Sequence, residues 1–212
     1  MRILLVDHGC CDHPHTRVHR LRDGLRAVGC AASVCGPASV PSLAARPEGL
    51  HGIHLHDVAA ASRVFLAAVR DGGAEAFLAA TAAVPARILG LARETARQVI
   101  AEATDLVDPE VIFVLHAGIL TDLAVETGAP VVVHVAPADL AAAAKRPSLR
   151  SLVSRAIGSC DLVVAADEPT AAAVRARWLP HDATACEAWP LSPDGGDLIA
   201  AACRRAISQR RG

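Results

Sequence analysis

The chain has 212 residues, 52% of them hydrophobic, which is enough for one substantial core and favours one large domain over two. It carries 21 lysines and arginines against 22 aspartates and glutamates, and only 2% aromatic residues, so nothing indicates nucleic acid as a partner. No segment is apolar for long enough to span a membrane, and the first apolar run is too short for a signal peptide. The seven cysteines are an odd number without paired spacing, so we expect reduced thiols and a cytoplasmic protein.

The opening of the chain predicts the first half of a βαβ unit. Residues 3–6 are an uninterrupted apolar run, as expected of a strand buried on both faces of a parallel sheet. Gly9 ends this run, and apolar residues then recur at helical spacing from Val18 to Val28. Ligands of open α/β sheets lie outside the carboxyl ends of the strands, so the loop from His8 to Arg17 is the first candidate for function.

The same alternation of strand and helix continues to the end of the chain. Further strands are predicted at 31–35, 50–56, 111–115, 131–135, 161–165 and 183–188. Further helices are predicted at 59–69, 74–83, from Pro85 onward, at 120–127, at 149–157 after a cap at Ser148, from 167 to about 178, and at 197–208. Gly128 is expected to close the helix at 120–127. We therefore predict one α/β domain over 1–212, a Rossmann-like open parallel sheet with helices on both faces.

Histidines occur at the ends of four predicted strands. They are His8, His54 or His56, His116 and His134. Right-handed crossovers bring the carboxyl ends of parallel strands to one edge, so these side chains should line a common cleft with the loop that holds His13, His15 and Arg17. Any one of them alone is more simply a histidine bonded to a backbone carbonyl, and Arg17 alone is equally well a surface charge.

Other chemistries find less support in the sequence. The segment Cys10, Cys11, Asp12, His13 and His15 offers metal-binding residue types, but adjacent residues rarely bind one ion together and no CxxC pair is present. A cysteine or serine nucleophile beside a histidine lacks a GxSxG elbow, and no GxGxxG or Walker lysine motif indicates a dinucleotide or P-loop site. We expect no metal and no cofactor.

Three stretches resemble the amino-terminal half of a GT-B glycosyltransferase of the retaining family-4 kind. The opening Arg2 to Gly9, with the helix that ends at Gly29, is similar to the family's first strand, glycine loop and helix. The stretch Asp108-Pro-Glu-Val-Ile-Phe-Val-Leu-His116, followed by Gly128-Ala-Pro-Val-Val-Val-His134, is similar to its paired strands that end in histidine. The segment 156–164 with the helix after it is similar to its A-D-x-V stretch, so that the likeness covers about residues 1–190.

The resemblance implies a role for each strand-end residue. Gly9 would lie near the donor phosphates, although Cys10 stands where the family has a second glycine. His134 would face the transferred sugar, and His116 would lie on the acceptor side. The expected catalytic residues are thus His134 and His116, and the expected substrate-binding residues are His8, Gly9, His13, His15, Arg17, His56, Asp57, Gly118 and Asp139.

The resemblance also implies a partner. In the family a second domain holds most of the nucleotide-sugar, whereas after Pro190 this sequence offers one terminal helix, so a separate donor-binding subunit or a homo-oligomer is expected. The first hypothesis is therefore a glycosyltransferase domain or subunit that binds a small-molecule acceptor. The alternatives are a non-catalytic Rossmann-like binding or scaffold protein and, less favoured, a metal-dependent hydrolase that uses the loop at 10–15.

Overall fold

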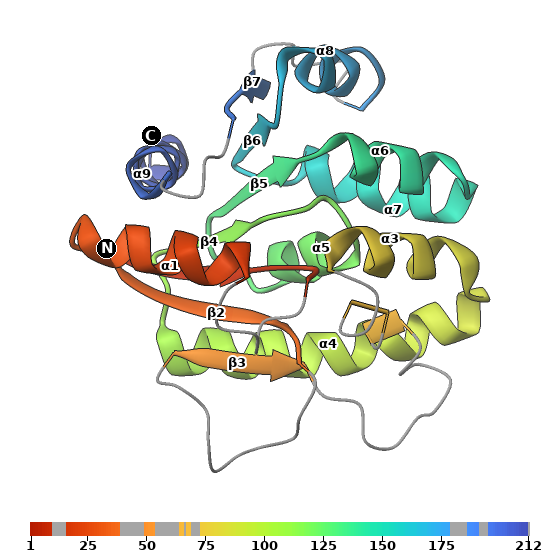
Figure 1. Ribbon diagram of the computed structural model, residues 1–212, viewed down its shortest axis with the longest axis horizontal. Coiled ribbons are helices and arrows are strands. Elements are labelled where there is room, and N and C mark those ends of the chain that lie inside the picture. Colours follow the sequence, from red (N-terminus) through yellow and green to blue (C-terminus); the bar gives the residue numbers. More distant parts are fainter. Residues whose placement is uncertain are drawn as a thin grey trace.

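Seven parallel strands form a single sheet in the order β3-β2-β1-β4-β5-β6-β7 (Figure 1). The computed structural model describes residues 1–9, 16–38, 49–53, 64–65, 67–68, 73–178, 186–190 and 195–211. The strands are β1 Arg2–Val6, β2 Ala31–Pro37, β3 Leu50–Ile53, β4 Val111–Val114, β5 Val131–Val135, β6 Leu162–Ala165 and β7 Cys186–Ala188. The predicted Rossmann-like α/β fold is confirmed.

Helices cover both faces of the sheet. They are α1 Arg17–Ala27, α3 Ala74–Ala83, α4 Ala86–Val107, α5 Ile119–Glu126, α6 Pro137–Ala144, α7 Pro147–Gly158, α8 Glu168–Arg177 and α9 Gly196–Arg211. Figure 1 shows α1 and α9 together on one side of the sheet and α3 to α7 on the other. Among the described residues, no helix combines the length and the apolar character needed to cross a membrane.

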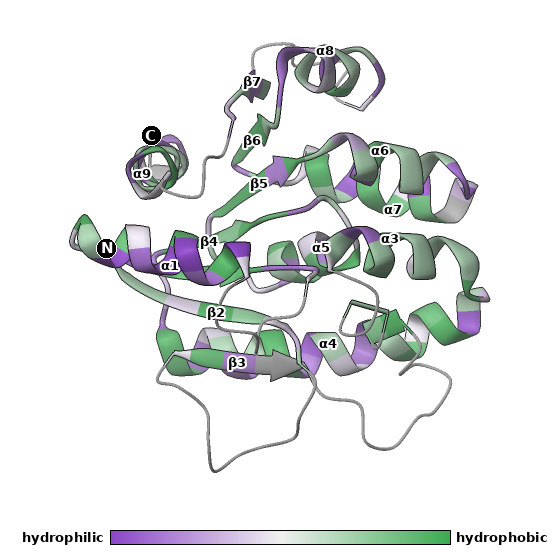
Figure 2. Cartoon of the chain, in the orientation of Figure 1, coloured by the Kyte–Doolittle hydropathy of each residue, from purple (hydrophilic) through white to green (hydrophobic). Residues whose placement is uncertain are grey.

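The core follows from the period of the strands. Successive strand side chains point to opposite faces, so Ile3 and Leu5 pack with α1 and α9, whereas Leu4 and Val6 pack with α4 and its neighbours. Because both faces are covered, the central strands are apolar along most of their length, while α1 and α4 carry alternating hydrophobic and hydrophilic bands (Figure 2). The apolar runs that predicted the strands thus contribute alternate residues to two hydrophobic clusters, one on each face of the sheet.

Two helix ends match their sequence signals closely. Gly128 follows α5 with a φ of 81°, the left-handed conformation that a glycine adopts without steric cost. Asp108 closes α4 with a φ of 45°, and the Arg2 side chain donates to its backbone carbonyl at 2.6 Å. The predicted glycine cap of α5 is therefore confirmed, and β1 is tied to the end of α4.

Other elements differ from the prediction. Helix α6 was not predicted, because the segment PADLAAAA has no amphipathic period. Its signals are only a proline in the first turn and Asp139, whose carboxylate accepts the Ala136 backbone N–H. Helix α7 begins at Pro147, before the predicted cap at Ser148, since proline fits the first turn of a helix. His134 lies within β5 rather than at its end. Residues 54–56 and 183–185 lie outside the described residues, and of the helix predicted at 59–69 only 64–65 and 67–68 are described, all as helix.

Candidate functional site

Three histidines gather at the carboxyl edge of the sheet because β1, β4 and β5 are adjacent strands. His8 follows β1, His116 follows β4, and His134 lies near the end of β5. The rings of His8 and His116 pack edge to face with their centroids 6.0 Å apart. Of the histidines predicted to share this edge, the three that the structure describes do lie on adjacent strands there.

Asp139 holds His116 in a defined state. The carboxylate Oδ1 lies 2.9 Å from His116 Nδ1, while Oδ2 accepts hydrogen bonds from the backbone N–H groups of Ala117 at 2.9 Å and Ala136 at 2.8 Å. A carboxylate only accepts hydrogen bonds, so Nδ1 of His116 carries its proton and Nε2 is the nitrogen left for chemistry. The Asp139 side chain is 0% exposed and that of His116 is 12% exposed, so only the imidazole reaches solvent.

The electrostatic environment makes His116 more basic than an ordinary histidine. Burial by itself would lower its pKa, but the charge and hydrogen bond of Asp139, helped by the charge of Asp7, outweigh burial and raise that pKa, with Arg17 opposing. The Asp7 carboxylate is itself held at the end of β1, where it accepts a hydrogen bond from the Gly9 backbone at 3.1 Å. A basic imidazole backed by a buried carboxylate is suited to accept and return a proton near neutral pH.

His8 is fully buried beneath His116. Its Nε2 accepts a hydrogen bond from the Leu120 backbone N–H at 3.3 Å, so the proton of the neutral ring is on Nδ1. No described residue accepts that proton. Burial, followed by the nearby charge of His116, holds the pKa of His8 well below its usual value, so the ring stays neutral.

Two neighbours fix the position of the His8 ring. Phe77 of α3 packs edge to face against it at a centroid distance of 5.3 Å. Gly118 leaves the space that the ring needs, since a Cβ at that position would lie 2.5 Å from His8 Nε2. Gly118 is thus required by steric fit rather than by an unusual backbone angle.

His134 is the third buried imidazole. Its Nδ1 donates to the Leu115 carbonyl at 3.3 Å, which leaves Nε2 as an acceptor with no partner among the described residues. Burial, then the charges of Arg17 and His116, lower the pKa of His134 to about 4. His134 is therefore a neutral acceptor below the surface, and of the three rings His116 is the one with direct access to a ligand.

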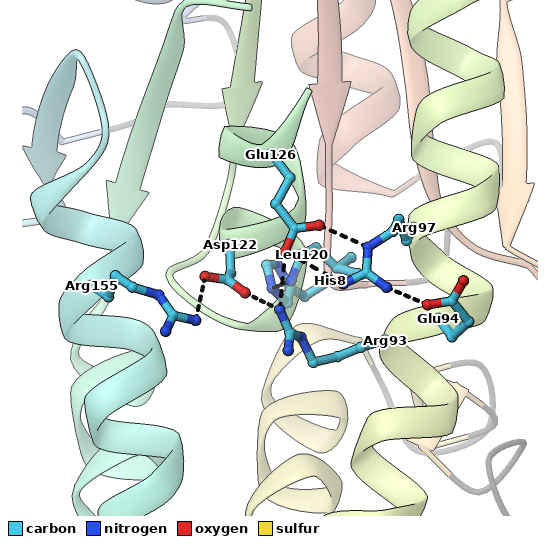
Figure 3. Close-up of polar contacts among 8 residues, drawn as sticks. All are labelled: His8, Arg93, Glu94, Arg97, Leu120, Asp122, Glu126 and Arg155. Carbon is cyan, nitrogen blue, oxygen red and sulfur yellow. Dashed lines mark hydrogen bonds and ion pairs between the residues drawn. The ribbon is translucent and has the colours of Figure 1, made fainter. Parts of the chain in front are cut away.

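Helix α5, which binds His8 through its first turn, is fixed by ion pairs to the helices on either side (Figure 3). Asp122 is bound by Arg93 of α4 and, at 3.1 Å, by Arg155 of α7. Glu126 accepts a hydrogen bond from Arg97 of α4 at 2.7 Å. These contacts set the position of the helix amino terminus against which His8 rests.

Several predicted site residues lie outside the described part of the chain. They are His13, His15, His56 and Asp57, together with Cys10, Cys11 and Asp12 of the metal alternative. Among the residues that are described, no group of three histidine, cysteine or acidic side chains could hold a metal ion. The roles of the predicted binding residues remain predictions.

The described cysteines form no disulfide. They are Cys30, Cys35, Cys160, Cys186 and Cys203. Burial raises the pKa of the Cys160 and Cys203 thiols, and raises that of Cys186 to about 11, so none of the three is a thiolate at neutral pH. They serve as small core residues.

The fold is similar to that of GT-B glycosyltransferases. A sucrose-phosphate synthase chain from Thermosynechococcus elongatus matches with a TM-score of 0.55 and 12% identity, covering 100% of both chains. MurG of Acinetobacter baumannii matches with a TM-score of 0.47 and 12% identity over 88% of this chain and 44% of that one. The SsfS6 glycosyltransferase of Streptomyces sp. SF2575 matches with a TM-score of 0.44 and 15% identity over 81% and 51%. A search with protein-family models and a search of curated proteins both gave no match.

Proposed function

We propose that the chain is the acceptor-binding domain of a GT-B glycosyltransferase of the family-4-like kind, which transfers a sugar from a nucleotide-sugar together with a donor-binding domain on another chain. The observation that carries this proposal is the His116–Asp139 pair at the carboxyl edge of the sheet. The fold shared with sucrose-phosphate synthase supports it at the level of architecture only.

The chemistry assigned to the pair is removal of a proton from the acceptor. As the hydroxyl oxygen of the acceptor bonds to the anomeric carbon, the bond from that carbon to the nucleoside diphosphate breaks, and Nε2 of neutral His116 takes the hydroxyl proton. Asp139 keeps the ring in the required tautomer and stabilises the imidazolium that forms. General base catalysis of this kind contributes roughly 10²- to 10⁴-fold in rate.

His134 and His8 act from below the surface in this proposal. Each has a fixed tautomer, with an acceptor nitrogen on His134 and a donor nitrogen on His8 that no described residue satisfies. Such groups can complete the hydrogen bonds of a hydroxyl-rich acceptor if the site opens toward them. Arg17, whose charge affects His116 and His134, supplies a cation at the first turn of α1 for an acceptor or donor phosphate.

A binding experiment on the purified chain tests the acceptor role. A panel of unlabelled monosaccharides and inositol is titrated into the protein while the imidazole resonances are followed by NMR. We expect one acceptor to shift the His116 resonance, and His116→Gln to retain binding because glutamine can still donate to Asp139. The exposed variant Asp105→Asn serves as the control that leaves binding unchanged. Failure of every compound to shift His116 would overturn the acceptor role.

A transfer assay then separates a catalyst from a binding protein. The chain is combined with a donor-binding domain and a radiolabelled nucleotide-sugar, and product is measured for the parent, His116→Gln and His134→Ala. We expect at least a 100-fold loss for His116→Gln with the acceptor still bound. Binding without transfer by the parent would instead support the non-catalytic alternative, and equal transfer by all three proteins would refute the roles of both histidines.

A further inference from the structure

A cavity lies at the opposite edge of the sheet from the histidines. It has a volume of about 470 Å³ and is formed where β1, β2 and β3 begin, between the last turns of α1 and α4. Cavities of this size accommodate small organic ligands. None of the residues assigned to acceptor binding lines it, so its use is independent of the proposed transferase site.

The lining of this cavity is basic. Its described lining residues include Arg2, Arg26, Ser33 and His51, and none of the described lining residues is acidic. Arg26 donates to the Ala32 carbonyl at 3.0 Å through Nη2, and no described carboxylate forms an ion pair with it. The other N–H groups of that guanidinium are therefore not used by this bond, and a planar guanidinium matches the oxygens of a phosphate group well.

The backbone at Gly49 makes room for these groups. A Cβ at Gly49 would lie 3.1 Å from Arg26 Nη2 and 3.1 Å from Ser33 Oγ, so both polar groups converge on the space where a side chain would stand. Gly49 also has a φ of 81°, which disfavours any other residue there. A donor hydroxyl and a guanidinium that approach the same point form a small cradle for one anionic group.

The second cation of the cavity, Arg2, donates through Nε to the Asp108 backbone carbonyl at 2.6 Å, and only its ion pair with the Asp108 carboxylate is exposed. The Arg2 guanidinium lies 3.1 Å from the Asp108 carboxylate, but the side chains are 49% and 89% exposed. Ion pairs this exposed contribute little, so Arg2 can exchange part of that contact for a stronger anion without a large loss. Beside it, Leu106, a residue that is 78% exposed, gives the cavity an apolar wall.

From this arrangement we infer that the cavity is a binding site for a small organic phosphate, with the phosphate between Arg26, Ser33 and Arg2 and the organic part against Leu106. The volume of the cavity exceeds that of a phosphate ion alone. A bare anion would gain nothing from contact with the apolar wall, whereas the organic part of a phosphate ester would. The ligand class is a phosphomonoester of a sugar or of a nucleoside.

Isothermal titration calorimetry at low salt tests this site with three probes: inorganic phosphate, ribose 5-phosphate and adenosine 5′-monophosphate. We expect a phosphomonoester to bind more tightly than inorganic phosphate, and Arg26→Ala to weaken it at least tenfold. Arg22→Ala is the matched control, because Arg22 lies on the same helix, pairs with Asp23 and does not line the cavity. Leu106→Ala should weaken the binding of the phosphomonoester and leave the binding of inorganic phosphate unchanged.

Three outcomes would overturn the inference, and one variant separates it from the transferase proposal. Equal binding of the phosphomonoester by the parent and Arg26→Ala, or no binding of any probe, would refute the phosphate site. Equal affinity for all three probes would refute the proposal that the ligand has an organic part. His116→Gln should bind the phosphomonoester as the parent does, so a loss in that variant would place the ligand in the other site. Chemical shift changes at the Ser33 and Gly49 amides, absent in Arg26→Ala, would locate the ligand directly.

Discussion

The Asp139 carboxylate lies 2.9 Å from His116 Nδ1, although the two residues are 23 positions apart and belong to segments that follow different strands, the loop after β4 and helix α6 after β5. Asp139 is the third residue of α6, where its second oxygen also caps the helix by accepting the Ala136 backbone N–H. One side chain therefore fixes the start of a helix, the loop after β4 and the tautomer of the exposed histidine. Asp139 therefore positions His116, and the substrate-binding role predicted for Asp139 stays a prediction.

Asp139→Asn should lower the pKa of His116. The carboxylate is what outweighs burial in raising that pKa, so an uncharged amide leaves burial as the larger effect. The measurement is an NMR titration of the His116 ring, with Asp105→Asn, a change in an exposed residue of α4, as the control. An unchanged His116 pKa in the Asp139→Asn protein would show that the two groups do not interact in solution.

His134 should make the protein sensitive to acid. Its pKa is near 6.5 when unfolded and about 4 when folded, so its contribution to stability is complete above pH 6.5 and is lost as the pH falls toward 4. A lowering of the His134 pKa by this amount corresponds to about 3 kcal/mol of unfolding free energy. His116 acts in the opposite sense, since its raised pKa adds stability at low pH that is lost as the pH rises.

Urea unfolding of His134→Gln between pH 7 and pH 4.5 isolates this effect. The glutamine can still donate to the Leu115 carbonyl but does not titrate, so the fall in stability with acid should be shallower than in the parent. Parallel pH curves for the two proteins would mean that His134 is accessible to protons in the folded state.

The fold could be predicted because its signals are local. Runs such as 111–114 and 131–135 are apolar enough to be buried on both faces, and the helices between them show the helical period or a clear cap. Helix α6 escaped prediction because alanines fill both its buried and its exposed positions. Its one informative residue, Asp139, could equally be part of a polar loop until the capping hydrogen bond is seen.

The candidate site could be predicted only in part from the sequence. The rule that parallel strands end at one edge predicted that His8, His116 and His134 would meet, because it needs only the order of strand and helix. The depth of each ring depends instead on what packs over it, such as Phe77 of α3 over His8, and that contact joins residues 69 positions apart in the chain. The pairing of His116 with Asp139 is likewise a contact between the loop after β4 and the first turn of α6, which no periodic pattern encodes.

Gly118→Ala should destabilise the protein, whereas Gly90→Ala should not. A Cβ at Gly118 would lie 2.5 Å from His8 Nε2, so the ring must move and lose its hydrogen bond to the Leu120 backbone, at a cost of roughly 1–3 kcal/mol. Gly90 lies within α4 with open space around it, so alanine there should stabilise by about 0.5–1 kcal/mol. Urea unfolding checks both, and equal stability of the two variants would contradict the packing of His8 against Gly118.

Asp122→Asn should lower the free energy of unfolding more than a substitution in an exposed ion pair does. The Asp122 side chain is 7% exposed and binds both Arg93 and Arg155, so losing its charge should cost roughly 1–3 kcal/mol. Glu94→Gln is the matched control, because the ion pair of Glu94 with Arg97 is exposed and should be worth less than about 1 kcal/mol. A similar small loss for both variants, measured by urea unfolding, would show that the network in Figure 3 does not position α5.

The contact between α1 and α9 predicts opposite effects at its two glycines. A Cβ at Gly196 would lie 2.4 Å from the carbonyl carbon of Gly24 and 2.5 Å from its oxygen, and since both are backbone atoms the helices must separate. Gly196→Ala should therefore cost about 1–3 kcal/mol or more of unfolding free energy. A Cβ at Gly24 would instead lie 3.5 Å from the nearest atom, an ordinary contact, so Gly24→Ala should stabilise α1 by about 0.5–1 kcal/mol. Thermal and urea unfolding of the two variants test this prediction. Stability changes of the same sign at both positions would mean that α9 does not cross α1 at this point.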